Sequence, residues 1–415
     1  MNFIAVIILV TIIANTALHF WADVLNLKVL GSRLPESFKG VYDEDQYRKS
    51  QDYLRTTTRF GFVTEAFNLL VLLLFWFSGG FALLDQWVRS FGWGPVPSGL
   101  LYMGVPALLY AVLMQPFSIY STFVIEERFG FNQTTKYTYI SDLAKGVGLS
   151  ILLGAPLLAV ILAFFEYVGT FAWLYCWIGV TVYMLIIQFI APTWIMPLFN
   201  KFTLIEDGDL KEAILDYARS IHFSLKNVYV MDGSKRSGKS NAFFTGFGKN
   251  RRIVLFDTLI EKHTTRELVA VLAHEMGHYK KRHIIQSLVM GICQMGVVFF
   301  LLSLFISCRG LFDAFYMKQT SVYAGLIFFS MLYSPIDFFM EIFMQIRSRK
   351  NEYEADRFAV QTTGDPEAMA NALKKLSVHN LSNLMPHPFY VFLNYSHPPV
   401  LERLRAIRME AESAQ

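Results

Sequence analysis

The sequence predicts a predominantly α-helical membrane protein with seven transmembrane helices and a polar region of mixed α and β structure. The first observation is composition: the 415 residues are 54% hydrophobic and only 17% charged, whereas soluble domains carry about 25% charged residues. The second is that seven apolar segments each have the roughly 20 residues that a bilayer crossing needs. The third is a long polar stretch between the fifth and sixth segments, which is too large to be a simple loop.

The apolar segments divide the chain into four parts. Residues 1–196 hold five spans and their loops, residues 197–283 are polar, residues 284–346 hold two more spans, and residues 347–415 form a polar tail with a helical pattern. No basic residues precede the first segment and no small-residue cleavage site follows it, so we expect a retained span rather than a signal peptide. A polar loop is expected over residues 22–59. The expected spans are Phe3–Trp21, Phe62–Leu84, Leu100–Val124, Val147–Val168, Phe171–Met196, Ile284–Ser307 and Val322–Ile346.

Basic residues predict the orientation of these spans. The first, third and fifth loops are rich in Lys and Arg, while the second loop has only Arg89 and the fourth has none. The positive-inside rule therefore places the odd loops, the polar region and the C-terminus in the cytoplasm, and the N-terminus outside.

The polar region is expected to form a helix and a small sheet. Asp209–Ile221 is amphipathic, Val228–Met231 is a short strand, and Ser240–Thr245 and Arg252–Phe256 form a hairpin around Gly246–Asn250. In zinc peptidases such a sheet offers an edge strand on which an extended peptide binds. The alternative is a hairpin that only packs against the helix that follows it.

Charge and cysteine content exclude other classes. A net charge of +4 gives no reason to expect nucleic acid as a partner. The apolar composition makes the lipid bilayer the expected surroundings of the chain. Cys176, Cys293 and Cys308 are scattered and offer neither a disulfide framework nor the spacing of metal ligands.

The segment Val271–His278, VLAHEMGH, predicts a metal site. Thr264 and Glu267 form a capping-box pattern at the start of its helix. His274 and His278 are four residues apart and lie on one helix face, where two imidazoles can bind one Zn²⁺. Glu275 can then reach a water on the metal as general base. A chance match on an amphipathic helix is the alternative.

A third ligand is expected from the stretch NEYEAD, on the helical continuation of the seventh span. Glu352 and Asp356 share a helix face, and Glu354 points to the opposite side. We expect Glu352 to bind the metal and Asp356 to hold a ligand histidine through its other ring nitrogen. The alternative is a solvated charged face.

Two further features point to the same region. Asp337, Glu341 and Gln345 form a polar stripe on the seventh span, which indicates a water-filled space between helices or a set of interhelical hydrogen bonds. His397, in the segment SHPPVLERL, either stabilises a developing oxyanion or caps the helix Pro398–Met409.

These motifs resemble the type I CAAX prenyl protease family of integral-membrane zinc metalloendopeptidases, which are gluzincins. The resemblance rests on four motifs that occur in that family's order, SNAFFTGFGKNRRIVLFDTLI, HEMGH, NEYEAD and SHPPVLERL. It also covers EERFGFNQTT, PTWIMPLFNKF and the number of seven spans. The heat-shock membrane metalloproteases share the zinc motifs but have fewer spans. The resemblance implies a ring of seven helices around a water-filled chamber, capped by a zincin-like catalytic domain. It also implies one Zn²⁺ per chain on His274, His278 and Glu352, with Asn241, His397 and Arg403 near the active site.

The expected activity is hydrolysis of CAAX-type C-terminal peptides, prenylated or not. Glu275 and His397 are the expected catalytic residues, and Asn241, Ala242, Phe243 and Arg403 are expected to bind substrate. The chain ends without a basic retrieval signal, so we expect a bacterial homologue in the inner membrane, or the endoplasmic reticulum membrane if it is eukaryotic. The alternatives are a membrane quality-control protease of loose specificity, and a transporter or scaffold with structural zinc.

Overall fold

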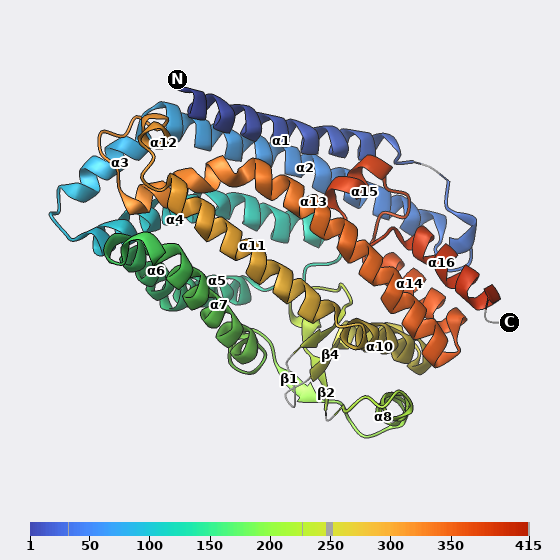
Figure 1. Ribbon diagram of the computed structural model, residues 1–415. Coiled ribbons are helices and arrows are strands. Elements are labelled where there is room, and N and C mark those ends of the chain that lie inside the picture. Colours follow the sequence, from blue (N-terminus) through green and yellow to red (C-terminus); the bar gives the residue numbers. More distant parts are fainter. Residues whose placement is uncertain (32, 226, 246–251, 414–415) are drawn as a thin grey trace.

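The structure is a computed structural model that describes residues 1–31, 33–225, 227–245 and 252–413. Long helices lie side by side along most of its length, and a small sheet sits at one end together with helix α10 (Thr265–Lys280) (Figure 1). The polar region is therefore attached to one end of the helical part.

Seven helices in the described ranges are long and apolar enough to cross a membrane, which confirms the predicted number. Several contain short π or 3₁₀ segments within one continuous rod. They are α1 (Phe3–Lys28), α2 (Glu44–Phe77), α4 with η2 (Pro95–Glu126), α5 with α6 (Lys136–Tyr167), α7 with its flanking turns (Gly169–Leu198), α11 (His283–Phe305) and α13 (Val322–Thr363).

Two predicted boundaries near the N-terminus are wrong. The expected polar loop over residues 22–59 is mostly helical, because α1 continues to Lys28 and α2 begins at Glu44, where the Asp43 side chain accepts a hydrogen bond from the Gln46 N–H at 2.7 Å. The expected span Phe62–Leu84 is interrupted, because Gly79 has a φ of 76° and ends the rod. A separate helix, α3 (Gly80–Arg89), follows.

Helix α13 is open on two opposite faces. Asp337 and Glu341 lie one turn apart and are exposed, and Phe339 and Phe343, two residues further along in each case, are 70% and 52% exposed. Residues two apart point to nearly opposite sides of a helix. In a membrane, the phenylalanine face suits lipid, and the acidic face requires water. The described spans have few buried residues, 6–17% of each apolar window, so most of their surface is not covered by other parts of the protein.

The sheet has four strands in the order β1-β2-β4-β3. β2 (Val228–Met231) pairs in parallel with β4 (Arg252–Phe256), which pairs antiparallel with β3 (Ala242–Thr245). This confirms the predicted strands, while the expected turn Gly246–Asn250 lies outside the described residues. β1 (Phe202–Leu204) was not expected; it pairs antiparallel with β2.

The helices of the polar region pack around one hydrophobic core. They are α8 (Asp209–Ser220), α9 (Asp257–Lys262) and α10, joined from the C-terminal tail by α14 (Pro366–His379) and α16 (Val400–Ser413). Helix α15 (Pro388–Asn394) lies instead against α1 and α13. Leu268 and Leu272 of α10, Leu255 of β4, Ala359 of α13 and Ile407 of α16 meet in this core. The sheet, α10 and the tail are thereby held as one body.

Ion pairs hold this body against the ends of the membrane helices. Arg236 binds Asp142 of α5 through two hydrogen bonds of 2.7 and 2.9 Å. Lys239 contacts Glu126 at 3.1 Å and donates to the Tyr53 hydroxyl of α2 at 2.9 Å. Since these cations lie just before β3, the contacts position the edge of the sheet relative to the membrane.

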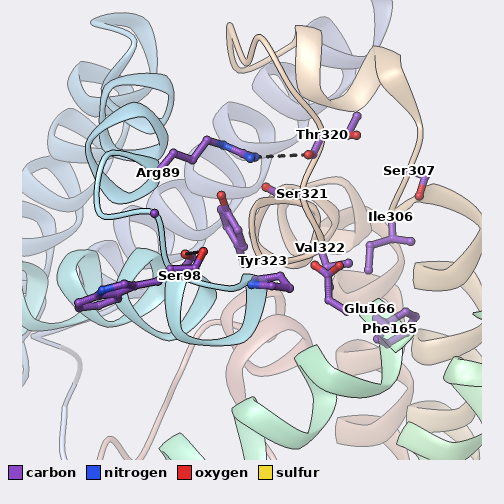
Figure 2. A pocket seen from close by; sticks show the side chains of 13 residues that line it. Arg89, Ser98, Phe165, Glu166, Ile306, Ser307, Thr320, Ser321, Val322 and Tyr323 are labelled. Carbon is purple, nitrogen blue, oxygen red and sulfur yellow. Dashed lines mark hydrogen bonds between the residues drawn. The ribbon is translucent and has the colours of Figure 1, made fainter. Parts of the chain in front are cut away.

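A polar cluster lies at the opposite end of the bundle, beside a cavity of about 620 Å³. Buried Asp85 accepts hydrogen bonds from the Tyr323 hydroxyl at 2.6 Å and from the Arg89 Nε at 2.8 Å. Figure 2 shows Arg89 reaching across to the backbone of Thr320, with Tyr323 below it. The cluster ties α3 to the start of α13.

Candidate metal centre

Helix α10 presents His274 and His278 from within the core. The expected capping box is present: Thr264 and Glu267 exchange backbone-to-side-chain hydrogen bonds, and Glu267 also pairs with Lys375 of α14 at 2.7 Å. Burial of Leu268, Leu272 and Met276 holds the helix against the sheet and tail. The two histidines therefore project from a rigid element.

The three expected ligands converge on one point. His274 Nε2 and His278 Nε2 are 3.2 Å apart, and the Glu352 carboxylate lies 3.5 Å from the first and 3.2 Å from the second. Atoms bound about 2.1 Å from a tetrahedral zinc are about 3.4 Å apart. Within the described residues, these three side chains form the one group of this kind. The donor set and its spacing fit a zinc ion.

Asp356 lies behind His274, on the side away from the other ligands. Its Oδ1 atom is 2.8 Å from His274 Nδ1. Arg403 of α16 donates two hydrogen bonds to the same carboxylate, at 2.8 and 2.6 Å. Burial opposes the charged imidazolium of His274, but the hydrogen bonds to Asp356 and Glu352 outweigh it and raise the pKa of His274 to about 9. The pocket thus favours positive charge at the ligand atoms.

Glu275 lies beside the three donors and is half-buried. Burial raises the pKa of its carboxyl group, and the nearby imidazoles act in the opposite direction. Together with Glu352 and Asp356 it brings three carboxylates against one guanidinium, that of Arg403. This balance suits a divalent cation, and a carboxylate with a raised pKa suits a general base.

His278 has a neighbour that the sequence did not predict. Its Nδ1 atom is 3.0 Å from Nδ1 of His283, whose Nε2 is 3.2 Å from Glu354. His283 follows His278 by five residues, so one continuous helix would turn it to another face. A reversal of the chain at Lys281–Arg282 brings it back. The presence of a third histidine in HEMGHYKKRH was the only available signal.

The C-terminal segment reaches the metal centre from the tail. His397 Nδ1 is 2.9 Å from Glu352 Oε2, and its side chain is 65% exposed. A cavity of about 430 Å³ lies here, lined by His397, Asn241 and Arg403 among others. The structure therefore brings these three expected residues to one side of the centre.

Strand β3 and a second cavity lie on the side of the metal centre that faces the membrane helices α7 and α11. This cavity, about 710 Å³, is lined by Phe243 and Phe244 of β3, by Glu275 and His278, and by residues of α7 and α11 such as Ile187 and Leu288. β3 is the last strand of the sheet in the described residues. Of the expected substrate residues, Phe243 thus lines this cavity together with His278 and an apolar wall, and Ala242 precedes it on β3.

Comparison with known families agrees with this geometry. Residues 24–201 match the family model described as CAAX prenyl protease N-terminal, five membrane helices. Residues 204–411 match the model of peptidase family M48.

Individual proteins match over nearly the whole chain. CAAX prenyl protease 1 homolog of Arabidopsis thaliana is 38% identical over 387 residues, covering 90% of each chain. CAAX prenyl protease 1 of Saccharomyces cerevisiae is 34% identical over 413 residues, covering 93% of this chain and 90% of the relative. The crystal structure of S. mikatae Ste24p superposes with a TM-score of 0.92 at 31% identity and covers 98% of this chain and 99% of the other.

Proposed function

The chain belongs to peptidase family M48 and to its CAAX prenyl proteases, and on that premise we propose that it cleaves CAAX-type proteins near their C-terminus, prenylated or not. Membership makes the chain a multi-pass membrane metallopeptidase that acts on peptide or protein substrates. The interpretation as a transporter or scaffold with structural zinc is therefore wrong.

His274, His278 and Glu352 would hold one Zn²⁺ per chain. When bound, the ion supplies a Lewis acid that makes water acidic near neutral pH. Glu275 takes a proton from the attacking water and passes it to the leaving amine. The observation that carries this proposal is the set of distances of 3.2–3.5 Å among the three donor groups, with Glu275 adjacent to them.

The remaining site residues orient the reacting groups. Asp356 accepts from His274 Nδ1–H and leaves its Nε2 lone pair free for the metal. Arg403 holds Asp356 in place and balances its charge. His397 stands at the exposed side of Glu352, where its ring N–H can donate to the carbonyl oxygen of a substrate as charge develops on it.

The substrate would lie along β3 as an added strand. Phe256 N–H donates to Asn241 O at 3.1 Å, so the alternation of an antiparallel ladder turns the backbone groups of Ala242 and Phe244 away from β4. Asn241 Oδ1 accepts a hydrogen bond from Ala242 N–H at 2.9 Å. A carbonyl oxygen of the substrate strand would replace this side-chain oxygen as the acceptor. Phe243 and the apolar wall of the 710 Å³ cavity suit the aliphatic residues of a CAAX sequence.

In the membrane, the catalytic end would face the cytoplasm and the N-terminus the outside. This proposal rests on the basic loops, because the Lys- and Arg-rich first, third and fifth loops adjoin the end that carries the sheet. Cytoplasmic proteins with C-terminal CAAX sequences would reach the site from that side. The proposed location is the inner membrane if the protein is bacterial, or the endoplasmic reticulum membrane if it is eukaryotic.

Glu275→Gln tests the mechanism. The purified chain, in detergent, is given a farnesylated CAAX peptide, and release of the C-terminal fragment is followed by mass spectrometry. The variant should bind zinc as wild type does and lose at least ~10³-fold in kcat, because the proton acceptor is gone. Glu261→Gln, at an exposed position of the same domain, is the matched control. Undiminished cleavage by Glu275→Gln would overturn the mechanism.

Glu352→Ala tests the ligand set. Metal analysis should find one zinc per wild-type chain and strongly reduced zinc in the variant. Stoichiometric zinc in Glu352→Ala would move the third-ligand role to another residue.

Substrate class is tested by competition between two substrates. The wild-type chain should cleave the CAAX peptide in preference to an unfolded membrane protein, and the unprenylated peptide shows whether the lipid contributes. Equal or faster cleavage of the unfolded protein would favour a quality-control protease.

A further inference from the structure

We propose that His283 is a positioning residue that links Glu354 to the metal ligand His278 and holds His278 in the tautomer that binds metal. This inference rests on the proposed metal centre. It assigns a role to two side chains that the proposed mechanism does not use.

The backbone turn between α10 and α11 places His283 close to His278. Helix α10 ends at Lys280 and α11 begins at His283, and Arg282 between them has a φ of 60°. A non-glycine residue in this left-handed region is uncommon and needs support from its surroundings. The turn brings the His283 ring to 5.2 Å from the His278 ring, centroid to centroid, and leaves His283 only 4% exposed.

The protons of the two rings can be assigned from the contacts. His278 turns Nε2 toward His274 and Glu352, so a metal there requires Nε2 without a proton. The single proton of neutral His278 then lies on Nδ1, which faces His283 Nδ1 at 3.0 Å. Two N–H groups cannot face each other at that distance, so His283 Nδ1 must be the acceptor.

The same reasoning fixes the other side of His283. With Nδ1 unprotonated, the proton of the neutral ring lies on Nε2, which is 3.2 Å from Glu354 Oε2. The chain of donors therefore runs in one direction, from His278 to His283 to Glu354. No other arrangement of the protons satisfies all three contacts together with metal binding.

His274 and His278 are thus supported in two different ways. His274 donates to Asp356 directly, and Arg403 braces that carboxylate. His278 reaches its carboxylate, Glu354, through the ring of His283. Groups that orient a metal-bound histidine typically account for 10–100-fold in metal affinity, so loss of His283 should be measurable on zinc binding itself.

Three variants of the full-length protein in detergent separate hydrogen bonding from packing. His283→Phe keeps a ring and removes both nitrogens, and should weaken zinc binding about 10–100-fold. His283→Asn places an amide oxygen where Nδ1 lies but does not reach Glu354, so it should bind zinc more tightly than His283→Phe and about as tightly as Glu354→Leu. Glu354→Leu removes the final acceptor and should weaken binding by about 10-fold. His222→Phe, at an exposed histidine of the same domain, is the control.

The readouts are the zinc Kd from chelator competition and the visible spectrum after loading with Co²⁺, which reports ligand geometry. The thermal midpoint of the chelator-treated protein shows whether each variant is folded. Equal loss in His283→Phe and His283→Asn, with folded protein, would mean that His283 only packs, and the inference would be wrong. An unchanged Kd in His283→Phe would also overturn it. Absence of zinc binding by wild type would instead overturn the proposed metal centre.

Discussion

Arg403 donates two hydrogen bonds to Asp356, from Nε to Oδ2 at 2.8 Å and from Nη2 to Oδ1 at 2.6 Å. Both side chains are buried, with 11% and 2% of their side-chain surface exposed. Residues 47 positions apart in sequence are thereby joined beside the metal ligands. The pair determines where the His274 ring can point.

We expect Arg403→Met to destabilise the protein by about 3–5 kcal/mol, because it leaves the Asp356 charge buried without a partner. Arg403→Lys keeps the charge but not the planar fork, and should give an intermediate loss of thermal stability and zinc affinity. Thermal midpoint and chelator competition measure the two effects. Arg405→Met changes an exposed arginine of the same helix and should alter neither. If Arg403→Lys matches wild type in zinc affinity, the fork does not position His274.

We expect substitutions in the cluster of Asp85, Arg89 and Tyr323, at the opposite end of the bundle, to change stability but not catalysis. Tyr323→Phe removes a donor from buried Asp85 and should cost about 1–3 kcal/mol. The thermal midpoint in detergent measures this, with Tyr316→Phe at an exposed tyrosine as control. Since Tyr323 lies far along the bundle from His274, kcat/KM well below the midpoint should be unchanged; a large loss there would show coupling between the two ends.

Acid should destabilise the body formed by the sheet, α10 and the C-terminal tail, and His379 of α14 contributes to this effect. Burial, with Lys262, His263 and Lys375 nearby, lowers the pKa of His379 to about 4, below the ordinary 6.5. Between these two pKa values the folded chain therefore binds fewer protons than the unfolded chain. As pH falls from about 7 toward 4, this histidine lowers the free energy of unfolding.

The measurement is the thermal midpoint of wild type and His379→Gln at several pH values and a fixed heating rate. Between pH 7 and pH 5 the variant should lose less stability than wild type, by ~2–4 °C, which corresponds to about 1 kcal/mol after allowance for solvent screening. His222→Gln, at an exposed position, should follow wild type. Parallel curves for wild type and His379→Gln would contradict the assignment.

How much of this centre could be predicted depends on how far apart its residues lie in sequence. His274, Glu275 and His278 share one helix, so their spacing alone places them on one face. Glu352 and Asp356 likewise share a face of α13, and the expectation that this helix continues beyond the seventh span is confirmed. Sequence spacing was sufficient for these residues because the spacing of two residues on a helix determines whether their side chains share a face.

His283 and Glu354 could not be predicted in the same way. Their contact depends on the reversal at Arg282, whose φ of 60° has no sequence signal, since the residue is neither glycine nor asparagine. Glu354 was expected to point away from the metal face; it does, and α11 supplies a partner there. β1, with three residues, is too short to show a period. The interruption at Gly79 does have a signal, Ser78-Gly79-Gly80, but the apolar residues on both sides of it favoured one continuous span.

The free edge of β3 leads to the sharpest test of how substrate binds. Ala242 N–H points away from β4, so Ala242→Pro removes a donor from the free edge without removing a bond of the ladder. If a peptide pairs there, KM should rise about 10-fold, the equivalent of one hydrogen bond of ~1.4 kcal/mol, while kcat and zinc affinity change little. Ala242→Ser keeps the N–H group and is the control. An unchanged KM in a folded Ala242→Pro variant would mean that the substrate lies elsewhere, and the 430 Å³ cavity beside His397 would become the place to test next.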